Sequence, residues 1–445
     1  MERPIDTRGY RQLFIRDDLI ESIKGLTRVV NQPRKYHANP VLTYDKPWEG
    51  NCVITWGSVL YDSKEKLFRI WYEVYRRPKD DKKDIILCYA ASKDGIHWEK
   101  PSLGLVDYKG SKDNNIVFEP PGGTLDSPTV IEDPRDSDPE RRFKLFFHTG
   151  GRSPRGIYMA CSPDGIHWNL EEDVKVKAGD RNTAYYDDLI SKYRVVTRIP
   201  GRGIRTCGLW ESDDCRRWEF VKEILAPDED DPPGTQLYGM VAFCYEGIHL
   251  GYVEPFFVPK RKLKAQLIYS IDGYNWMRAC DRKTFLDWGP EGSWDSAWVF
   301  PSHNPPIRIG DELFIFYQGR KTLHWSRGPY WVIGSIGLSF LRPDGFVSLD
   351  AIYDEGTVTT SPLLLRGDEL HVNAEARPGY VAAEILDSEG EVVPGFEKKS
   401  CTPMCCTDSL DYVLSFGKSL RQIDEEAVKV RFYIRGAKLY SFWLQ

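Results

Sequence analysis

Apolar and polar residues alternate in short runs along most of the chain. Runs such as LFRIWYEVY, RFKLFFHT and ELFIFYQG place large apolar side chains at every second position. This period of two is typical of strands that bury one face. Aromatic residues make up 13% of the chain, including 14 Trp and 24 Tyr, and they favour strands further because flat rings suit a pleated surface. The pattern predicts an all-β protein.

One seven-residue phrase recurs between these runs. SKDGIHW at 92–98 returns almost unchanged as SPDGIHW at 162–168, and weaker copies are ESDDCRRW at 211–218, SIDGYNW at 270–276 and RPDGF at 342–346. Asp-Gly between two β-rich runs predicts a hairpin turn, because Gly accepts positive φ and Asp bonds the turn backbone. The Trp that follows can pack over a neighbouring sheet. Each copy therefore closes one structural unit.

The spacing of the copies indicates the architecture. Their final aromatic residues lie 70, 50, 58 and 70 residues apart, which suits a four-stranded unit with variable loops. Four strands repeated five times predict a five-bladed β-propeller. In the fifth unit the expected strands are SAWVFPS, ELFIFYQG, VIGSIGLSFL and FVSLD, and the early segment RQLFIRDDLIESIKGLTRVV is expected to add strands that close the ring. A pair of ordinary β-sandwiches is the alternative, which the fivefold turn spacing disfavours.

The repeated phrase stops near Asp354, and the pattern changes. Runs such as DELHVNAEA, GYVAAEIL and VKVRFYIRGAKLYSFWL alternate with period two around Gly-containing turns, which is a β-sandwich pattern. The predicted domains are therefore a propeller over residues 1–353 and a small C-terminal β-sandwich over residues 354–445. We expect the sandwich to brace the propeller, with contact to a ligand as the alternative.

Charge and composition narrow the class of function. The formal net charge is -6 without a long run of one sign, so a nucleic-acid partner is not expected. No apolar run is long enough to span a membrane and the first residues lack a signal-peptide core, so we expect a cytoplasmic protein. The ten Cys are mostly scattered in apolar runs, and the CTPMCC cluster lacks a CxxC pair or a nearby His, so no metal site is expected.

Acidic residues concentrate where a propeller gathers its loops. Loops that enter innermost strands, and the ends of second strands, meet at one mouth of the central channel. Hydrolysis of a glycosidic bond needs one carboxyl group as acid and a second as base or nucleophile, and crowding separates their pKa values. The pattern indicates acid/base catalysis on a polar neutral substrate. The acids expected at this mouth are Glu49, Glu73, Asp126, Asp180, Glu254 and Asp295.

Aromatic and basic residues at the same mouth are expected to bind a sugar. Flat rings can stack on a sugar face, and an arginine can pair with an acid or with a substrate oxygen. The expected substrate-binding residues are Trp48, Glu73, Tyr75, His148, Arg198, Tyr238, Trp294, Asp295, Tyr317, Arg320 and His324. Any single acid can instead be a turn former. Those after the innermost strands, such as Asp133 and Asp187, are interpreted as solvated turns.

The chain resembles the five-bladed propeller superfamily of glycoside hydrolases that includes families 32, 43, 62 and 68. The resemblance rests on NPVLTYDKPWEG, the SxDGIHW turns, GPEGSWDSAWVFPS and the terminal GAKLYSFWL, although no WMNDPNG-like stretch opens the first unit. In families 32 and 43 three acids from different blades converge. The resemblance implies that Glu49 is the base or nucleophile where those families use Asp, that Asp126 is the second acid, and that Glu254 is the proton donor.

Together these features predict a glycosidase that acts on a small oligosaccharide or glycoside, with no cofactor. A non-catalytic carbohydrate-binding propeller is the alternative from another class. The sugar, its linkage, the stereochemical outcome, a homo-oligomeric state and an axial calcium ion stay open.

Overall fold

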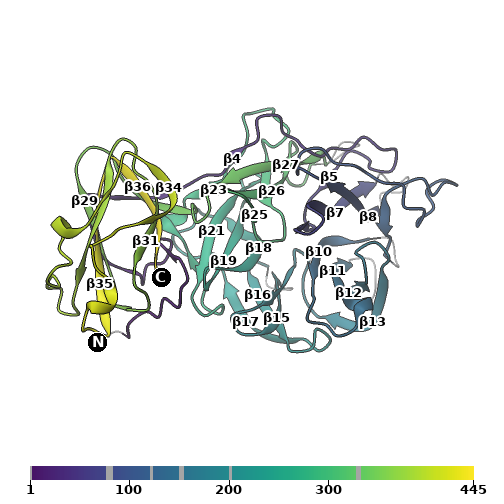
Figure 1. Ribbon diagram of the computed structural model, residues 1–445. Coiled ribbons are helices and arrows are strands. Elements are labelled where there is room, and N and C mark those ends of the chain that lie inside the picture. Colours follow the sequence, from purple (N-terminus) through teal and green to yellow (C-terminus); the bar gives the residue numbers. More distant parts are fainter. Residues whose placement is uncertain (1–2, 77–83, 121–123, 150–154, 200–202, 327–331) are drawn as a thin grey trace.

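The computed structural model describes residues 3–76, 84–120, 124–149, 155–199, 203–326 and 332–445. Strands form nearly all of its regular structure, so the prediction of an all-β protein is confirmed. Figure 1 shows two groups of strands, with the C-terminal strands gathered apart from the others. The helical elements within the described ranges are four short 3-10 turns: η1 (Pro139–Arg141), η2 (Cys280–Arg282), η3 (Lys398–Ser400) and η4 (Leu420–Gln422).

The first three predicted units are separate antiparallel sheets. In the second and third, the strands pair in chain order, as expected for propeller blades. The first sheet contains β5 (Val53–Ile54), β6 (Val59–Asp62), β7 (Leu67–Arg76), β8 (Asp84–Ser92) and β9 (Ile116–Phe118). The second contains β10 (Asp126–Glu132), β11 (Phe143–Thr149), β12 (Gly156–Ser162) and β13 (Asn169–Val176). The third contains β14 (Thr183–Asp187), β15 (Lys192–Arg198), β16 (Cys207–Ser212) and β17 (Glu219–Leu225).

The fourth and fifth units share one 11-stranded sheet, joined by a parallel pairing of Leu263 with Trp298. The fourth contributes β18 (Thr235–Tyr245), β19 (Ile248–Phe257), β20 (Lys262–Leu263), β21 (Ala265–Ser270), β22 (Met277–Arg278) and β23 (Thr284–Leu286). The fifth contributes β24 (Trp298–Pro301), β25 (Ile307–Ile309), β26 (Glu312–Arg320) and β27 (Gly334–Leu341). Its outermost strand is the N-terminal β4 (Arg34–Lys35), which pairs with β27.

The fifth unit closes differently from the prediction, both at FVSLD and at the early segment 11–30. FVSLD does not form the outer strand of the fifth unit, because β28 (Val347–Ala351) pairs with β3 (Thr27–Val30) and β36 (Ala437–Leu444) instead. The early segment at 11–30 likewise joins the C-terminal sheets, and the fifth unit is completed by β4 together with a bridge between Leu42 and Ile336. Local alternation reveals a strand but carries no information about which distant edge it pairs with.

The repeated phrases form the predicted turns. At the second copy, Asp164 Oδ1 accepts hydrogen bonds from the backbone N–H of Ile166 at 2.8 Å and of His167 at 2.9 Å. Ser162 Oγ accepts from the N–H of Gly165 at 2.8 Å, where φ is +78°. Burial alone would raise the pKa of Asp164, but these hydrogen bonds and that to the His167 ring lower it to about 2. The acids of the repeated turns are therefore structural.

Each turn also contacts the unit before it, and the first turn contacts the last unit. The contacts are Trp98 with Phe316, Gly165 with Trp71, Trp218 with Phe146, Gly273 with Arg194, and Phe346 with Tyr245. These are the contacts that a closed ring of five units requires, while the blade count stays a prediction.

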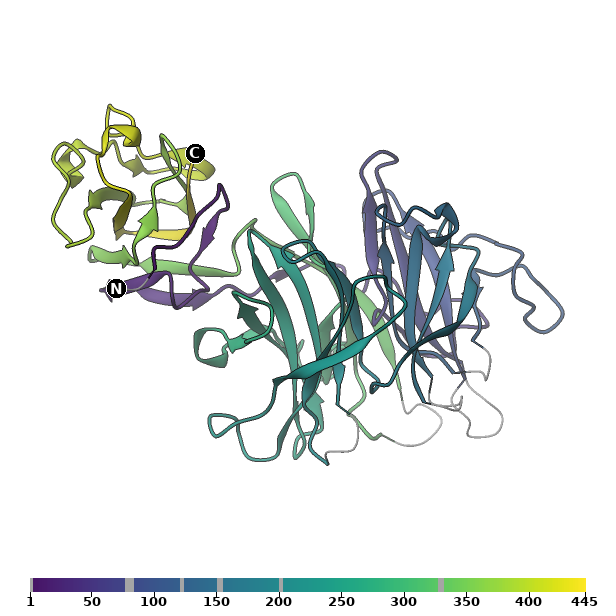
Figure 2. The same cartoon turned by 90° about the horizontal axis from the view of Figure 1, so that it is seen from below.

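The C-terminal region consists of two sheets that include N-terminal strands. One contains β1 (Gln12–Leu13), β3, β28, β31 (Leu370–Glu375), β34 (Asp408–Val413) and β36. The other contains β2 (Ile20–Lys24), β29 (Gly356–Thr360), β30 (Leu363–Leu364), β32 (Tyr380–Leu386), β33 (Met404–Cys405) and β35 (Ala427–Arg435). Figure 2 shows the purple N-terminal strands against this region. This region therefore includes three strands from before residue 31. Its later part begins at β28, which precedes the expected boundary at residue 354.

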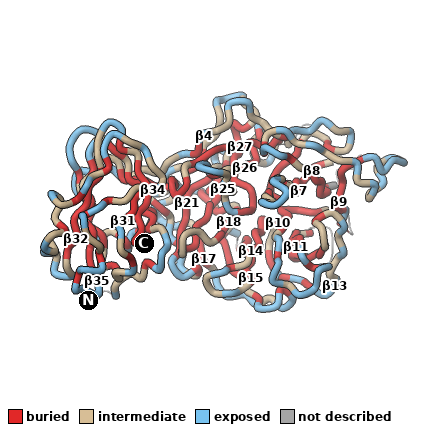
Figure 3. Tube along the Cα trace, in the orientation of Figure 1, coloured by how far each residue is buried: buried red, intermediate tan, exposed pale blue. Residues whose placement is uncertain are grey.

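Buried residues follow the strands of both regions, whereas the loops are mostly exposed (Figure 3). In the C-terminal region Phe14, Phe432 and Phe442 are fully buried, and the ring centroids of Phe432 and Phe442 lie 5.1 Å apart. The N-terminal segment thus supplies part of this core. Within the described residues, no helix has the length and hydropathy needed to cross a lipid bilayer.

Candidate functional site

A cavity of about 470 Å³ opens where all five units bring their inner strands together. Its described lining residues come from every unit, so the cavity lies on the common axis. They are Trp56, Tyr75, Asp126, Asp180, Arg181, Arg198, Arg205, Tyr238, Trp298, Arg320, Thr322, Leu323, His324, Trp325, Ser326 and Val332. Seven of the residues expected at this mouth are among them: Tyr75, Asp126, Asp180, Arg198, Tyr238, Arg320 and His324.

Asp126 reaches the cavity from the first residue of β10. A bulge interrupts the pairing of β10 with β11 between Asp126 and Thr129, and Ser127 adopts the left-handed conformation with φ +52°. Non-glycine residues in this region are strained, and such strain is concentrated at functional sites. The bulge re-aims the start of the strand and places a carboxylate in the cavity wall.

Glu73 lies behind Asp126 and is fully buried. Its Oε2 accepts a hydrogen bond from the backbone N–H of Ser127 at 3.3 Å. Burial and the negative charge of Asp126 raise the pKa of Glu73 well above its usual value, against the opposing charge of Arg320. Two neighbouring carboxyl groups of this kind retain a proton at neutral pH. Within this pair, Glu73 is therefore the group whose charged form is disfavoured.

Asp180 occupies the equivalent place in the third unit. It lines the cavity just before β14, and Arg181 after it is left-handed with φ +62°, as Ser127 is after Asp126. The sequence shares this register, because Asp126-Ser-Pro-Thr129 and Asp180-Arg-Asn-Thr183 both read DxxT. The sequence analysis placed Asp180 among the entering acids without assigning it a catalytic role. The DxxT repeat was the signal from which equivalent positions of Asp126 and Asp180 could have been predicted.

Glu254 lies behind the cavity wall, where both carboxylate oxygens are occupied. Its Oε2 accepts from Arg181 Nη2 at 2.6 Å, its Oε1 accepts from Trp298 Nε1, and the side chain is fully buried. Gly239 leaves room for this pair, because a Cβ there would lie 3.0 Å from Arg181 Nε. Glu254 thus holds two residues of the cavity wall, Arg181 and Trp298. Two other residues of the wall, Trp56 and Arg205, were not foreseen from the sequence.

Glu49 and Trp48 are located away from the cavity. Glu49 is fully buried and accepts hydrogen bonds from Tyr72 Oη at 2.7 Å and from Lys100 Nζ at 2.8 Å. Trp48 Nε1 donates to Asn115 Oδ1 at 2.8 Å. The expectation that Glu49 faces the channel is therefore wrong, because a buried lysine of its own unit pairs with the carboxylate.

Asp295, Trp294 and Tyr317 form another group that does not line the cavity. Asp295 Oδ2 accepts from Lys35 Nζ at 2.6 Å and from Tyr317 Oη at 3.3 Å. The rings of Trp294 and Tyr317 pack with their centroids 5.6 Å apart. Since Lys35 belongs to β4, this group fastens the closing strand to the fifth unit. The expected role of these three residues in substrate binding is corrected accordingly.

His148 lines a second groove of about 390 Å³ rather than the cavity itself. Asp180, Arg198 and Arg205 line both spaces, so the groove is continuous with the cavity. Arg198 forms an ion pair with Asp180, and its guanidinium carbon lies 4.6 Å from the Tyr238 ring centroid. His324 is in ring contact with Tyr238, and its Nε2 lies 3.0 Å from Tyr238 Oη.

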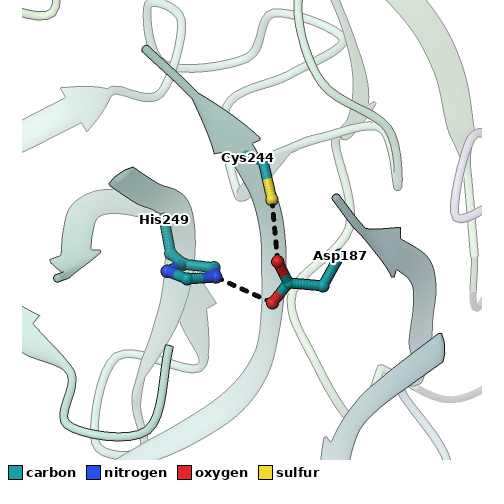
Figure 4. Close-up of side chains that lie close together, drawn as sticks. All are labelled: Asp187, Cys244 and His249. Atoms are coloured by element: carbon teal, nitrogen blue, oxygen red, sulfur yellow. Dashed lines mark hydrogen bonds and ion pairs between the residues drawn. The ribbon is translucent and has the colours of Figure 1, made fainter. Parts of the chain in front are cut away.

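A separate cluster lies at the opposite end of the inner strands. Asp187, Cys244 and His249 come together (Figure 4), where His249 Nε2 lies 2.7 Å from Asp187 Oδ2 and Cys244 Sγ lies 3.3 Å from Oδ1. The set resembles a metal site, but Arg194 Nη1 already pairs with Asp187 at 3.0 Å. Burial and Asp187 raise the pKa of Cys244 to about 12, so the thiol keeps its proton. Asp187 therefore already has a cationic partner in Arg194.

The second unit repeats this arrangement with other residues. Asp133 accepts hydrogen bonds from Lys144 Nζ at 2.8 Å and from Tyr193 Oη, which belongs to the third unit. Asp133 is 1% exposed and Asp187 is fully buried. The interpretation of these two acids as solvated turns is therefore wrong. They join neighbouring sheets, a role that becomes visible only when the next unit is in place.

Comparison with known proteins supports the fold. The chain matches no family model and no curated protein. A structure described as a "putative glycosidase" from Bacteroides thetaiotaomicron is 13% identical, covering 71% of this chain and 97% of that chain with a TM-score of 0.51. A glycosyl hydrolase from Bacteroides ovatus is 14% identical, covering 74% of this chain and 97% of that chain with a TM-score of 0.50. At these identities the likeness concerns the fold.

Proposed function

We propose that this protein is a glycosidase that hydrolyses a small oligosaccharide or glycoside in the axial cavity. The observation that carries the proposal is the pair Asp126 and Asp180. Both line one cavity from equivalent positions of neighbouring sheets, each beside a residue in the left-handed conformation. Hydrolysis of a glycosidic bond requires two carboxyl groups that reach the same bond. The fold shared with the two Bacteroides structures is consistent with this function.

The surroundings of the two acids suggest different roles. Asp180 forms an ion pair with Arg198, and a neighbouring cation favours the carboxylate form that a base or nucleophile needs. Asp126 lies next to Glu73, whose pKa is raised well above its usual value by burial and by the charge of Asp126. Asp126 is accordingly assigned the role of the acid that protonates the leaving oxygen. Glu254 is assigned a positioning role, since it bonds Arg181 and Trp298 instead of reaching the cavity.

The walls of the cavity suit a sugar. Trp56, Tyr75, Tyr238, Trp298 and Trp325 all contribute to its lining. Aromatic rings offer flat apolar faces for the C–H groups of a sugar ring, while the charged groups between them bond its hydroxyls.

A glycoside screen followed by amide substitutions tests the proposal. Wild-type protein is incubated with aryl glycosides and oligosaccharides, and released sugar is measured. The variants D126N and D180N should each lose about 10²- to 10⁴-fold in turnover, the contribution of a general acid or base. The matched control is D295N, because Asp295 enters the fifth unit in a similar place but does not line the cavity. Circular dichroism verifies that each variant is folded.

Wild-type turnover in both D126N and D180N would remove these two residues from the chemistry. Binding of sugars without product in the entire screen would favour the carbohydrate-binding alternative. In that case D126N and D180N should weaken sugar binding instead of turnover.

A further inference from the structure

The charges in the axial cavity do not balance. Four arginines and two aspartates are among its described lining residues. Arg198 pairs with Asp180, and Arg181 pairs with the buried Glu254 at 2.6 Å. Arg205 and Arg320 form no ion pair with a carboxylate of the described residues. Asp126 is the one lining carboxylate left, so positive charge is in excess.

Arg320 is the most unusual of these side chains. It is 5% exposed, yet its Nε and Nη2 donate to no acceptor within the described part of the chain. Its guanidinium carbon lies 4.1 Å from the Trp298 ring centroid and 4.6 Å from that of Trp56. These two adjacent rings, whose centroids lie 5.5 Å apart, pack against the guanidinium but cannot accept its in-plane hydrogen bonds. A buried charged donor without an acceptor costs free energy that a ligand can recover.

The nearest internal acid does not act as the counterion of Arg320. Glu73 interacts electrostatically with Arg320 but forms no ion pair with it in the described part of the chain, and burial and the charge of Asp126 raise the pKa of Glu73 well above its usual value, which disfavours its charged form. Arg205 is in a comparable position. Its Nη1 donates to Gln236 Oε1, a neutral acceptor, and burial together with the charge of Arg198 lowers its pKa. An anion in the cavity would stabilise both cations.

Arg205 and Arg320 pack on neighbouring rings of this cavity. The guanidinium carbon of Arg205 lies 5.2 Å from the Tyr238 ring centroid, and the rings of Tyr238 and Trp298 are 5.1 Å apart. A guanidinium presents parallel N–H donors that match the two oxygens of a carboxylate or phosphate. Arginine is therefore better suited than lysine to select an oxyanion in such a site.

We propose that the axial cavity binds an oxyanion through Arg320 and Arg205, either the carboxylate of an acidic sugar or inorganic phosphate. The inference deepens the proposed function by naming its substrate class. It also revises the expectation of a neutral substrate, which rested on counting acids along the sequence. In the structure Glu49 and Asp295 pair elsewhere, burial disfavours the charged form of Glu73, and Glu254 pairs with Arg181.

Calorimetric titration tests the proposal without requiring turnover. The probes are D-glucuronate, D-galacturonate and inorganic phosphate, with glucose and galactose as neutral counterparts of the two uronates. We expect at least one anion to bind wild type, and R320M to weaken that binding about tenfold or more, the effect of losing a charge-assisted hydrogen bond. R217M is the control, because Arg217 is an exposed residue of a repeated turn. Binding of a uronate would identify the oxyanion as the carboxylate of an acidic sugar, whereas binding of phosphate would identify it as inorganic phosphate.

R205Q serves as the second variant in case R320M does not fold, since Arg205 is only partly buried. The proposal is overturned if no anion binds better than the neutral sugars, or if R320M and R205Q both bind as wild type does. Failure of the oxyanion site can be distinguished from failure of the proposed glycosidase function. Anion binding without hydrolysis would refute the glycosidase, whereas hydrolysis of neutral glycosides without anion binding would refute only the oxyanion site.

Discussion

Replacing Glu254 by Gln separates the two roles that sequence and structure give to this residue. The resemblance to families 32 and 43 implies a proton donor, whereas the structure shows a buried carboxylate bonded to Arg181 and Trp298. A glutamine has one oxygen acceptor, so it cannot serve both donors, and it removes the negative charge. If Glu254 positions the cavity wall, its loss should destabilise the fold.

The structure gives the size of this effect. The side chains of Arg181 and Glu254 are 2% and 0% exposed, and their atoms lie 2.6 Å apart. Removing one partner of a buried ion pair costs about 3–5 kcal/mol, because the remaining charge is left uncompensated in a poorly solvated place. An exposed pair is worth only about 0–1 kcal/mol. Glu312→Gln is therefore the matched control, since Glu312 and its partner Arg34 are 48% and 66% exposed.

The assay is chemical denaturation followed by Trp fluorescence. E254Q should lower the midpoint clearly, and E312Q should leave it nearly unchanged. The double variant R181M/E254Q should recover part of the loss, because neither charge is then buried alone. Wild-type stability of E254Q, combined with a large loss of turnover, would refute this reasoning and support Glu254 as the proton donor.

The remaining predictions concern the repeated turn. Gly165→Ala should lower stability by about 1–3 kcal/mol more than Gly104→Ala in thermal or chemical denaturation, the usual cost of overpacking. Both glycines have positive φ, but a Cβ at Gly165 would lie 2.6 Å from Trp71 whereas one at Gly104 meets nothing within 4 Å; equal losses would contradict this packing. The pKa of Asp164 is lowered to about 2, so its stabilisation is complete above about pH 4 and is lost as the pH falls towards 2. Asp164→Asn should therefore flatten the acid limb of the stability curve, and an unchanged limb would refute this assignment.

Features that depend on neighbours in the chain were predictable from the sequence. The repeated turns formed as expected because Ser162, Asp164 and Gly165 bond one another within a few residues. Strands such as β7 and β11 followed from period-two alternation for the same reason. Seven of the residues expected at the mouth line the cavity, since loops entering and leaving inner strands meet at one mouth of a propeller.

The sequence by itself determined an all-β chain of repeated strand-and-turn units, because alternation and turn chemistry are local. The tertiary structure alone decided which acids reach the cavity. Glu49 pairs with Lys100 outside the cavity, and Asp187 pairs with residues of two sheets. Asp126, by contrast, lines the cavity. It also decided that β3 and β28 join the C-terminal sheets, since pairing partners lie hundreds of residues apart along the chain. A carboxylate's role depends on the cation beside it, and that cation is set by packing.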